Sequence, residues 1–133
     1  MSEWTTLTVL GNPAPQGSKQ HVGNGRMVES SKAVKPWREA VVWQCKGKAM
    51  IHGPVEVDIV FTLNKPLKVP KNRNGYPSCP PDIDKLLRST FDGLKTAGIF
   101  EDDSRVVKVT AEKRYHPPGS IWTGATIMIR RAA

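Results

Sequence analysis

The sequence predicts an α+β fold, a single domain in which a mixed β-sheet packs with two main helices. Its 133 residues suit one domain with a hydrophobic core. Four segments have the alternating or β-branched composition of strands, and two have apolar residues at helical spacing. The segments follow in the order strand, loop, helix, strand, long loop, helix, strand, strand, which favours a mixed sheet with helices.

The first half of the chain is expected to hold a strand, a basic loop or hairpin, and a helix. Residues 4–10 are rich in β-branched and apolar residues and predict a strand. Residues 18–30 contain a Gly-Asn-Gly turn at 23–25, which indicates a loop or hairpin with a basic tip. Ser30 and Ser31 can cap a helix that begins near Pro36. One apolar stripe along that helix comprises Val34, Trp37, Val41 and Cys45.

The second half is expected to hold a strand over residues 55–63, a helix from about 82 to 96 and two further strands. Residues 64–81 form a long connection rich in Pro, Asn and Lys. Such loops are uncommon unless they are functional or mobile. Gly98 occupies the position of a helix C-terminal cap. The segments 105–113 and 121–129 read as strands, and the Pro-Pro-Gly turn at 117–119 predicts that they pair as an antiparallel hairpin.

Charge is distributed unevenly along this basic chain. Twenty Lys and Arg against twelve Asp and Glu give a net charge of +8, which favours a polyanion as partner. Residues 82–103 reverse the sign, because they hold six acids and three bases, and the remaining 111 residues carry +11. A divalent cation, which needs hard oxygen ligands, explains why a phosphate-binding protein gathers its carboxylates in one segment.

Other classes of protein are disfavoured by composition. The sequence has no apolar run long enough to span a membrane and no secretory signal pattern. Cys45 and Cys79 lie far apart and without a Cys-x-x-Cys partner, which argues against zinc and against a disulfide framework. We therefore expect a cytoplasmic protein with reduced thiols. The four tryptophans are candidate interface anchors, but most of them are expected in the core.

The acidic segment contains three candidate metal ligands, Asp82, Asp84 and Asp103. Residues two apart on a helix diverge, but Asp82 follows two prolines and is expected to be extended, so that its carboxylate and that of Asp84 can converge on one ion. Asp103 joins them only if the chain doubles back after the helix. Three carboxylates around Mg²⁺ or Mn²⁺ would supply a Lewis acid for phosphodiester hydrolysis. The alternative is structural, since Asp is also a good helix N-cap and Asp-Asp-Ser an ordinary turn.

Arg88 stands four residues after Asp84 and four before Asp92. It can form two ion pairs on the helix surface, or it can stabilise the charge that develops on a phosphate in the transition state. The three histidines have no metal-ligand spacing and are expected in loops or on the surface.

The segments 81–94 and 97–107 together resemble the signature of RusA-type Holliday junction resolvases, a family common in bacteriophages and prophages. The similarity is ungapped over about 27 residues, and it includes the Asp-x-Asp pair, the Phe-Asp-x-Leu helix turn and the Asp-Asp before a strand. It implies a homodimeric, Mg²⁺- or Mn²⁺-dependent endonuclease with a RusA-like domain over residues 1–133, which recognises four-way DNA junctions by shape and cuts them symmetrically. A phage-encoded protein would act in the cytoplasm of the bacterial host.

The resemblance also implies roles for individual residues. The family's three essential acids fall on Asp82, Asp84 and Asp103, and its catalytic lysine falls on Arg88. Arginine keeps the charge but does not readily donate a proton, so Lys113 is considered as a substitute. The expected DNA-contacting residues are Lys19, Arg26, Lys68, Lys71, Arg73, Lys85 and Lys113. Three alternatives remain open: a branched-DNA binder with weak or no catalysis, a nuclease for flaps or forks, and a basic structural protein without a metal.

Overall fold

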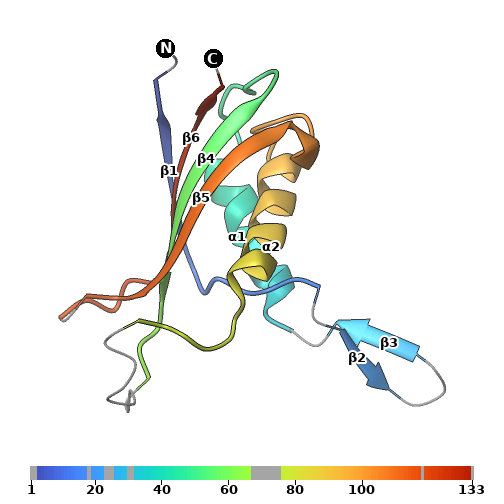
Figure 1. Cartoon of the computed structure of the whole chain (residues 1–133), viewed down its shortest axis with the longest axis vertical. Helices are drawn as coiled ribbons and strands as arrows, with labels where there is room; N and C mark the ends of the chain where they lie inside the picture. Colours follow the sequence, from blue (N-terminus) through green and yellow to red (C-terminus); the bar gives the residue numbers. More distant parts are fainter. Residues whose placement is uncertain are drawn as a thin grey trace.

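A four-stranded sheet with two helices on one of its faces forms the body of the protein, and a two-stranded hairpin projects from it (Figure 1). The computed structural model describes residues 3–17, 19–22, 26–29, 32–66, 76–117 and 119–132, and for 19–22 and 26–29 it describes the backbone alone. The elements are β1 (Thr5–Leu10), β2 (Lys19–Val22), β3 (Arg26–Glu29), α1 (Val34–Cys45), β4 (Val55–Leu63), α2 (Ile83–Thr96), the 3₁₀ turn η2 (Asp103–Arg105), β5 (Val106–Tyr115) and β6 (Gly124–Arg131). The predicted α+β class with a mixed sheet and two helices is confirmed.

The strand order of the main sheet is β1-β6-β4-β5, and this corrects the predicted pairing of the last two strands. β6 runs antiparallel to both β1 and β4, whereas β5 pairs with β4 in parallel. The β4–α2–β5 unit is a crossover through a helix, which places two strands in parallel. The predicted antiparallel hairpin of residues 105–113 and 121–129 is therefore wrong: both segments are strands, but β6 enters the middle of the sheet while β5 forms its edge.

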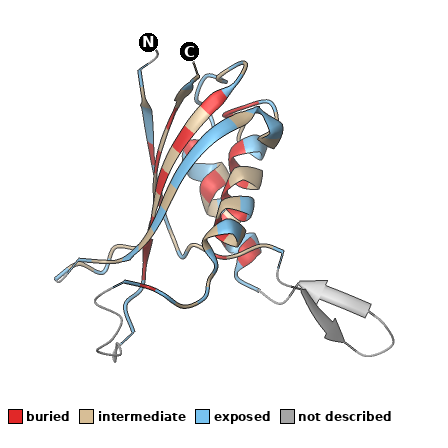
Figure 2. Cartoon of the chain, in the orientation of Figure 1, coloured by how far each residue is buried: buried red, intermediate tan, exposed pale blue. Residues whose placement is uncertain are grey.

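The core lies between the sheet and the helices. Alternate residues of β4 point to the helices and are buried, from Val55 through Phe61, and β6 does the same with Ala125, Ile127 and Ile129. The predicted stripe of α1 is buried against them (Figure 2). Burial at about 25 cal/mol per Å² of apolar surface makes this layer the main source of stability.

The helix boundaries follow local signals. α1 begins at Val34 with Ala33 as N-cap, two residues before the predicted start, while Ser30 and Ser31 lie outside the described residues. α2 ends with Gly98 at a φ of +82°, and the amides of Gly98 and Ile99 donate to the carbonyls of Lys95 and Leu94. This is a Schellman arrangement, which confirms Gly98 at the C-terminal end of the helix.

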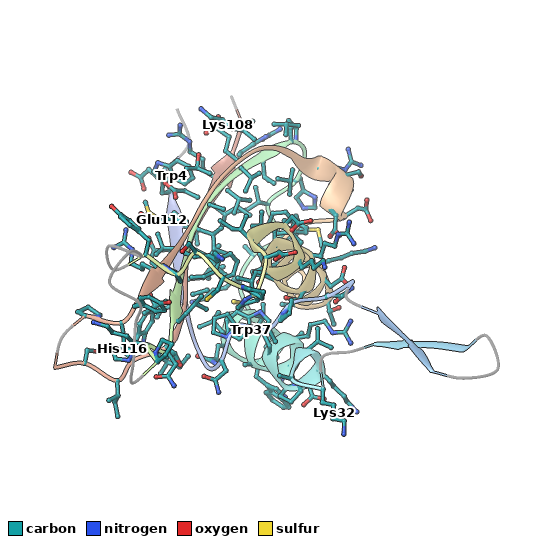
Figure 3. All side chains as sticks on the ribbon, turned by 60° about the horizontal axis from the view of Figure 1, so that its bottom comes forward. Trp4, Lys32, Trp37, Lys108, Glu112 and His116 are labelled. Atoms are coloured by element: carbon teal, nitrogen blue, oxygen red, sulfur yellow. The ribbon has the colours of Figure 1, made fainter. Side chains whose placement is uncertain are left out.

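The tryptophans differ from the prediction that most belong to the core. Trp37 is buried between helix and sheet, but Trp4 lies on the opposite, open face of the sheet (Figure 3), where Arg130 packs on its ring. Trp122 is half-buried, and Trp43 is exposed. A planar indole on an amphipathic helix is expected to be core, but Trp43 lies on the side of α1 away from the sheet.

Cys45 is buried and forms no disulfide with any residue that the structure describes. Burial raises the pKa of the Cys45 thiol to about 11. Within the described ranges, no helix has the length and apolar character needed to cross a bilayer.

Candidate active site

The N-terminal end of α2 presents two exposed carboxylates. Asp82 is the N-cap residue and has an extended backbone (φ −71°, ψ 140°), as its position after two prolines predicted. Its side chain makes no capping hydrogen bond, so the structural alternative of an ordinary N-cap is not realised. Asp84 is exposed in the first turn, where the helix dipole favours negative charge. The Lys85 ammonium lies 3.5 Å from Asp82 Oδ2.

Lys113 of β5 holds the chain that leads into this helix. Its Nζ donates to the carbonyl oxygens of Cys79 at 3.0 Å and Pro81 at 2.9 Å. Two of its three N–H groups therefore fix the backbone directly before Asp82. The side chain is half-buried, so the same contacts place a positive charge behind the acidic pair rather than in open solvent.

The segment before the β2–β3 hairpin lies along α2 and is fixed there by three hydrogen bonds. Ser89 Oγ donates to the carbonyl of Ala14 at 2.6 Å, the Gln16 amide donates to the carbonyl of Lys85 at 3.0 Å, and Gln16 Nε2 donates to Asp92 Oδ2 at 2.6 Å. These bonds orient the base of the hairpin relative to the same helix that carries Asp82 and Asp84.

Arg88 lies against this segment and is exposed. Gly17 has a φ of +99°, and a Cβ atom there would come within 2.5 Å of Arg88 Nη1. The structure shows neither of the predicted ion pairs with Asp84 and Asp92 among the residues that it describes, because Asp92 is engaged by Gln16 and Arg38 instead. The guanidinium is thus available beside the acidic end of the helix.

Asp103 lies with Asp92, near the other end of α2. The chain between α2 and β5, orange in Figure 1, lies at the end of the helix opposite to its yellow start. Burial and the negative charges of Asp92 and Asp102 raise the pKa of Asp103, whereas Lys95 opposes the shift. One oxygen, Oδ1, is buried and has no hydrogen-bond partner among the residues that the structure describes. Desolvation and the neighbouring negative charges both favour the protonated form of this carboxyl.

One chain does not bring the three predicted ligands together. Asp84 and Asp92 are eight residues apart on one helix, a rise of about 12 Å, and Asp103 accompanies Asp92. Among the described side chains, no group of three or more His, Cys, Asp or Glu residues is positioned to hold a metal ion. The predicted trio therefore does not fit a metal within a single chain, and it divides into Asp82 with Asp84 and Asp103 with Asp92.

Sequence reasoning passed over the residues that surround Asp103. Arg38 Nη1 donates to Gln16 Oε1 at 3.0 Å and lies 3.9 Å from Asp92 Oδ2, and Lys95 Nζ contacts Asp102 Oδ1 at 2.9 Å. The position of Asp92 within the acidic segment was a signal in the sequence that it could belong to the site. The sequence holds no such signal for Gln16 and Arg38, because contacts between a loop, α1 and α2 depend on the tertiary packing.

The predicted DNA-contacting residues fall into three groups. Lys85 contacts Asp82, and Lys113 holds the backbone directly before it. Lys19 begins β2 and Arg26 begins β3 of the predicted hairpin, which the structure confirms, but their side chains lie outside the described set. Lys68, Lys71 and Arg73 belong to residues 67–75, which also lie outside the described residues.

The raised pKa of Asp103 predicts a gain in stability when its charge is removed. A carboxyl whose pKa is raised in the folded state contributes most below its unfolded pKa, and that contribution is lost as pH rises through the folded pKa. We expect Asp103→Asn to increase the free energy of unfolding at neutral pH, with the difference vanishing toward about pH 4. Urea unfolding at a series of pH values measures this.

Asp102→Asn is the matched control with the opposite sign. The hydrogen bonds from Lys95 and Ser104 lower the pKa of Asp102, so that its contribution to stability is present above the unfolded pKa and is lost as pH falls. Asp102→Asn should therefore reduce stability at neutral pH. A loss of stability in Asp103→Asn at neutral pH would contradict the electrostatic description of this cluster.

A basic α+β domain that carries exposed carboxylates next to cations is typical of proteins that process nucleic acids. The family model for endodeoxyribonuclease RusA matches residues 11–129, nearly the whole chain, and the chain belongs to this family. Its members are DNA endonucleases of the Holliday junction resolvase class, so the protein is a DNA-cleaving enzyme that acts on branched DNA. No curated protein matches the sequence.

Proposed function

We propose that this protein resolves four-way DNA junctions by symmetric, metal-dependent hydrolysis of two phosphodiester bonds, as a homodimer. The observation that carries the proposal is the pair of exposed carboxylates at the start of α2, in a chain of the RusA family. One of them, Asp82, is the N-cap residue, but its side chain makes no capping hydrogen bond. Mg²⁺ or Mn²⁺ prefers such oxygen ligands. When bound, the ion would supply Lewis acidity to the phosphate and lower the pKa of water.

The residues around the pair have separate tasks in this proposal. Asp82 and Asp84 provide the first ligands, and Lys113 holds the backbone that presents Asp82. Arg88, free of ion pairs with the described residues, faces the charge that grows on the phosphate and stabilises it. Because a guanidinium stays protonated, Arg88 acts through its charge, and the leaving oxygen takes its proton from solvent.

The homodimer enters the proposal because the acids of one chain do not meet. Asp82 and Asp84 would form half of a site, and Asp103 of the partner subunit would complete it. Two-fold symmetry then creates two identical sites from the same contacts, which matches the two symmetric cuts that resolution of a junction needs. Asp103 is assigned to the partner's site because no group of three or more His, Cys, Asp or Glu residues forms a metal site among the described residues of one chain.

DNA contacts in this proposal surround the acidic centre. Lys85 lies beside Asp82, and the β2–β3 hairpin begins next to Arg88 and projects away from the body of the protein (Figure 1). We assign further phosphate contacts to the hairpin and to the connection over residues 64–81 because both are rich in Lys and Arg. Such contacts release counterions, so binding should weaken steeply with salt.

Incubation of the purified protein with a labelled four-way junction tests the proposal in one gel. We expect paired, symmetric nicks in the presence of Mg²⁺ or Mn²⁺ and none in EDTA. Binding without nicking in either metal would favour the branched-DNA binder, and preferential cutting of flaps or forks in competition would favour the alternative nuclease. Cleavage that persists in EDTA would overturn the metal dependence.

A further inference from the structure

Helix α1 carries a stripe of basic residues that has no part in the proposed active site at Asp82 and Asp84. Residues 32–48 hold five cations and one acid. Lys32, Lys35, Lys46 and Lys48 are exposed, and no ion pair joins them to any residue that the structure describes. Figure 3 shows Lys32 at the start of the helix, pointing away from the protein. Unpaired cations at this density attract a polyanion.

An exposed tryptophan lies among these cations. Trp43 is 68% exposed, and Lys46 Nζ lies 3.6 Å from its ring centroid. Lys35, Arg38, Val42 and Lys46 recur at spacings of three and four, so they share one side of α1, and Trp43 borders that side. The exposed indole offers a planar apolar face on which a nucleic-acid base can stack.

A groove of about 660 Å³ opens between α1 and α2 beside this ring. Trp43, Arg38 and Lys35 line one wall, and Lys95 and Thr96 line the other. Gly93 also lines the groove, at a point where a Cβ atom would meet Val41 at 2.8 Å, so the two helices are in close contact there. The groove thus joins an aromatic ring and cations, and the carboxylates of Glu39 and Asp92 also line it.

We propose that this stripe is a second DNA-binding surface, in which an unpaired base stacks on Trp43 while Lys35, Lys46 and Lys48 contact the adjoining phosphates. In the sequence, this stripe follows the β2–β3 hairpin directly, since β3 ends at Glu29 and α1 begins at Val34. Stacking on an aromatic ring within a basic groove is how proteins bind single-stranded segments without reading their sequence. The inference rests on the proposed function in taking branched DNA as the ligand.

The experiment compares the affinity of Trp43→Ala, Trp43→Phe and the double variant Lys35→Ala/Lys46→Ala for a four-way junction, a paired duplex and a single-stranded oligonucleotide. Trp43→Ala should weaken junction and single-strand binding by roughly fivefold to a hundredfold, with a smaller effect on the duplex. Trp43→Phe should retain most of the wild-type affinity for the junction and the single strand. The lysine variant should weaken binding to all three and make the salt dependence shallower by roughly two phosphate contacts.

Ile121→Ala and Lys108→Ala are matched controls, since Ile121 is 93% exposed and Lys108 is exposed on β5. Unchanged binding by Trp43→Ala, or equal losses in the controls, would overturn the surface. A change in sedimentation of Trp43→Ala instead of DNA affinity would identify the groove as an interface between two copies of the chain. If the wild-type protein does not cleave a junction, only the proposed function is refuted, because binding of the single-stranded oligonucleotide still tests the second DNA-binding surface.

Discussion

Asp82→Asn is expected to abolish cleavage of a four-way junction in Mg²⁺ while junction binding persists or strengthens. The substitution keeps the size of the side chain and removes its negative charge. The charge is the group we assign to the metal, so its loss should reduce the cleavage rate on the order of a thousandfold or more, as loss of a principal charge-stabilising group does. DNA binding gains because a carboxylate no longer repels the phosphates. Single-turnover cleavage and gel-shift titration measure the two effects separately.

Asp84→Asn should behave in the same way, and Asp58→Asn is the matched control. Asp58 is a half-buried acid of β4 on the face of the sheet opposite to the helices, so the same chemical change there should leave cleavage intact. Since the Asp82 side chain caps no helix amide, thermal unfolding should change little in Asp82→Asn. Cleavage at near wild-type rate by both Asp82→Asn and Asp84→Asn would refute the site at the start of α2.

Local sequence patterns predicted most helices and strands, but they did not predict how the strands pair, because pairing depends on tertiary contacts. The strand over residues 55–63 was predicted with its observed limits, and α2 differs by one residue at its start, because alternation and a helix cap are local signals. The pairing of β5 was predicted wrongly. A Pro-Pro-Gly turn suggests a hairpin. The order of the strands, however, depends on which of them can have a neighbouring strand on each side. β6, with a buried alternate face, takes the central place, and β5, with Lys108, Glu112 and Arg114 exposed, takes the edge.

The sequence named candidate site residues, but it did not predict how the fold arranges them. The extended backbone of Asp82 followed from the prolines before it, and the structure confirms it. The position of Asp103 could not follow from sequence, because it depends on how η2 folds onto α2. The structure places it with Asp92, and Gln16 and Arg38 from distant parts of the chain complete that cluster. Because the acids of one chain lie apart, the proposed function requires a dimer.

A mixed dimer of one Asp82→Asn chain and one Asp103→Asn chain tests whether the two protomers share each site. If Asp103 of the partner subunit completes the site, one site of the mixed dimer lacks both acids and the other keeps all of them. We therefore expect the mixed dimer to nick one strand of a junction, at up to about half the wild-type rate, although both parent homodimers are inactive. Sites built within one chain would each lack one acid, and the mixed dimer would be as inactive as its parents.

Two affinity tags purified in tandem isolate the mixed dimer, and the pairing of Asp82→Asn with Asp84→Asn is its control. Those two acids belong to the same end of α2, so each site of the control lacks one of them whether sites are shared or not, and it should stay inactive. Recovery of nicking in the first mixture but not in the second assigns Asp103 to the opposite protomer. No recovery in either would leave Asp82 and Asp84 as the centre and refute the shared site, because a closed two-fold dimer that joins Asp103 to the partner's acids must regenerate one complete set.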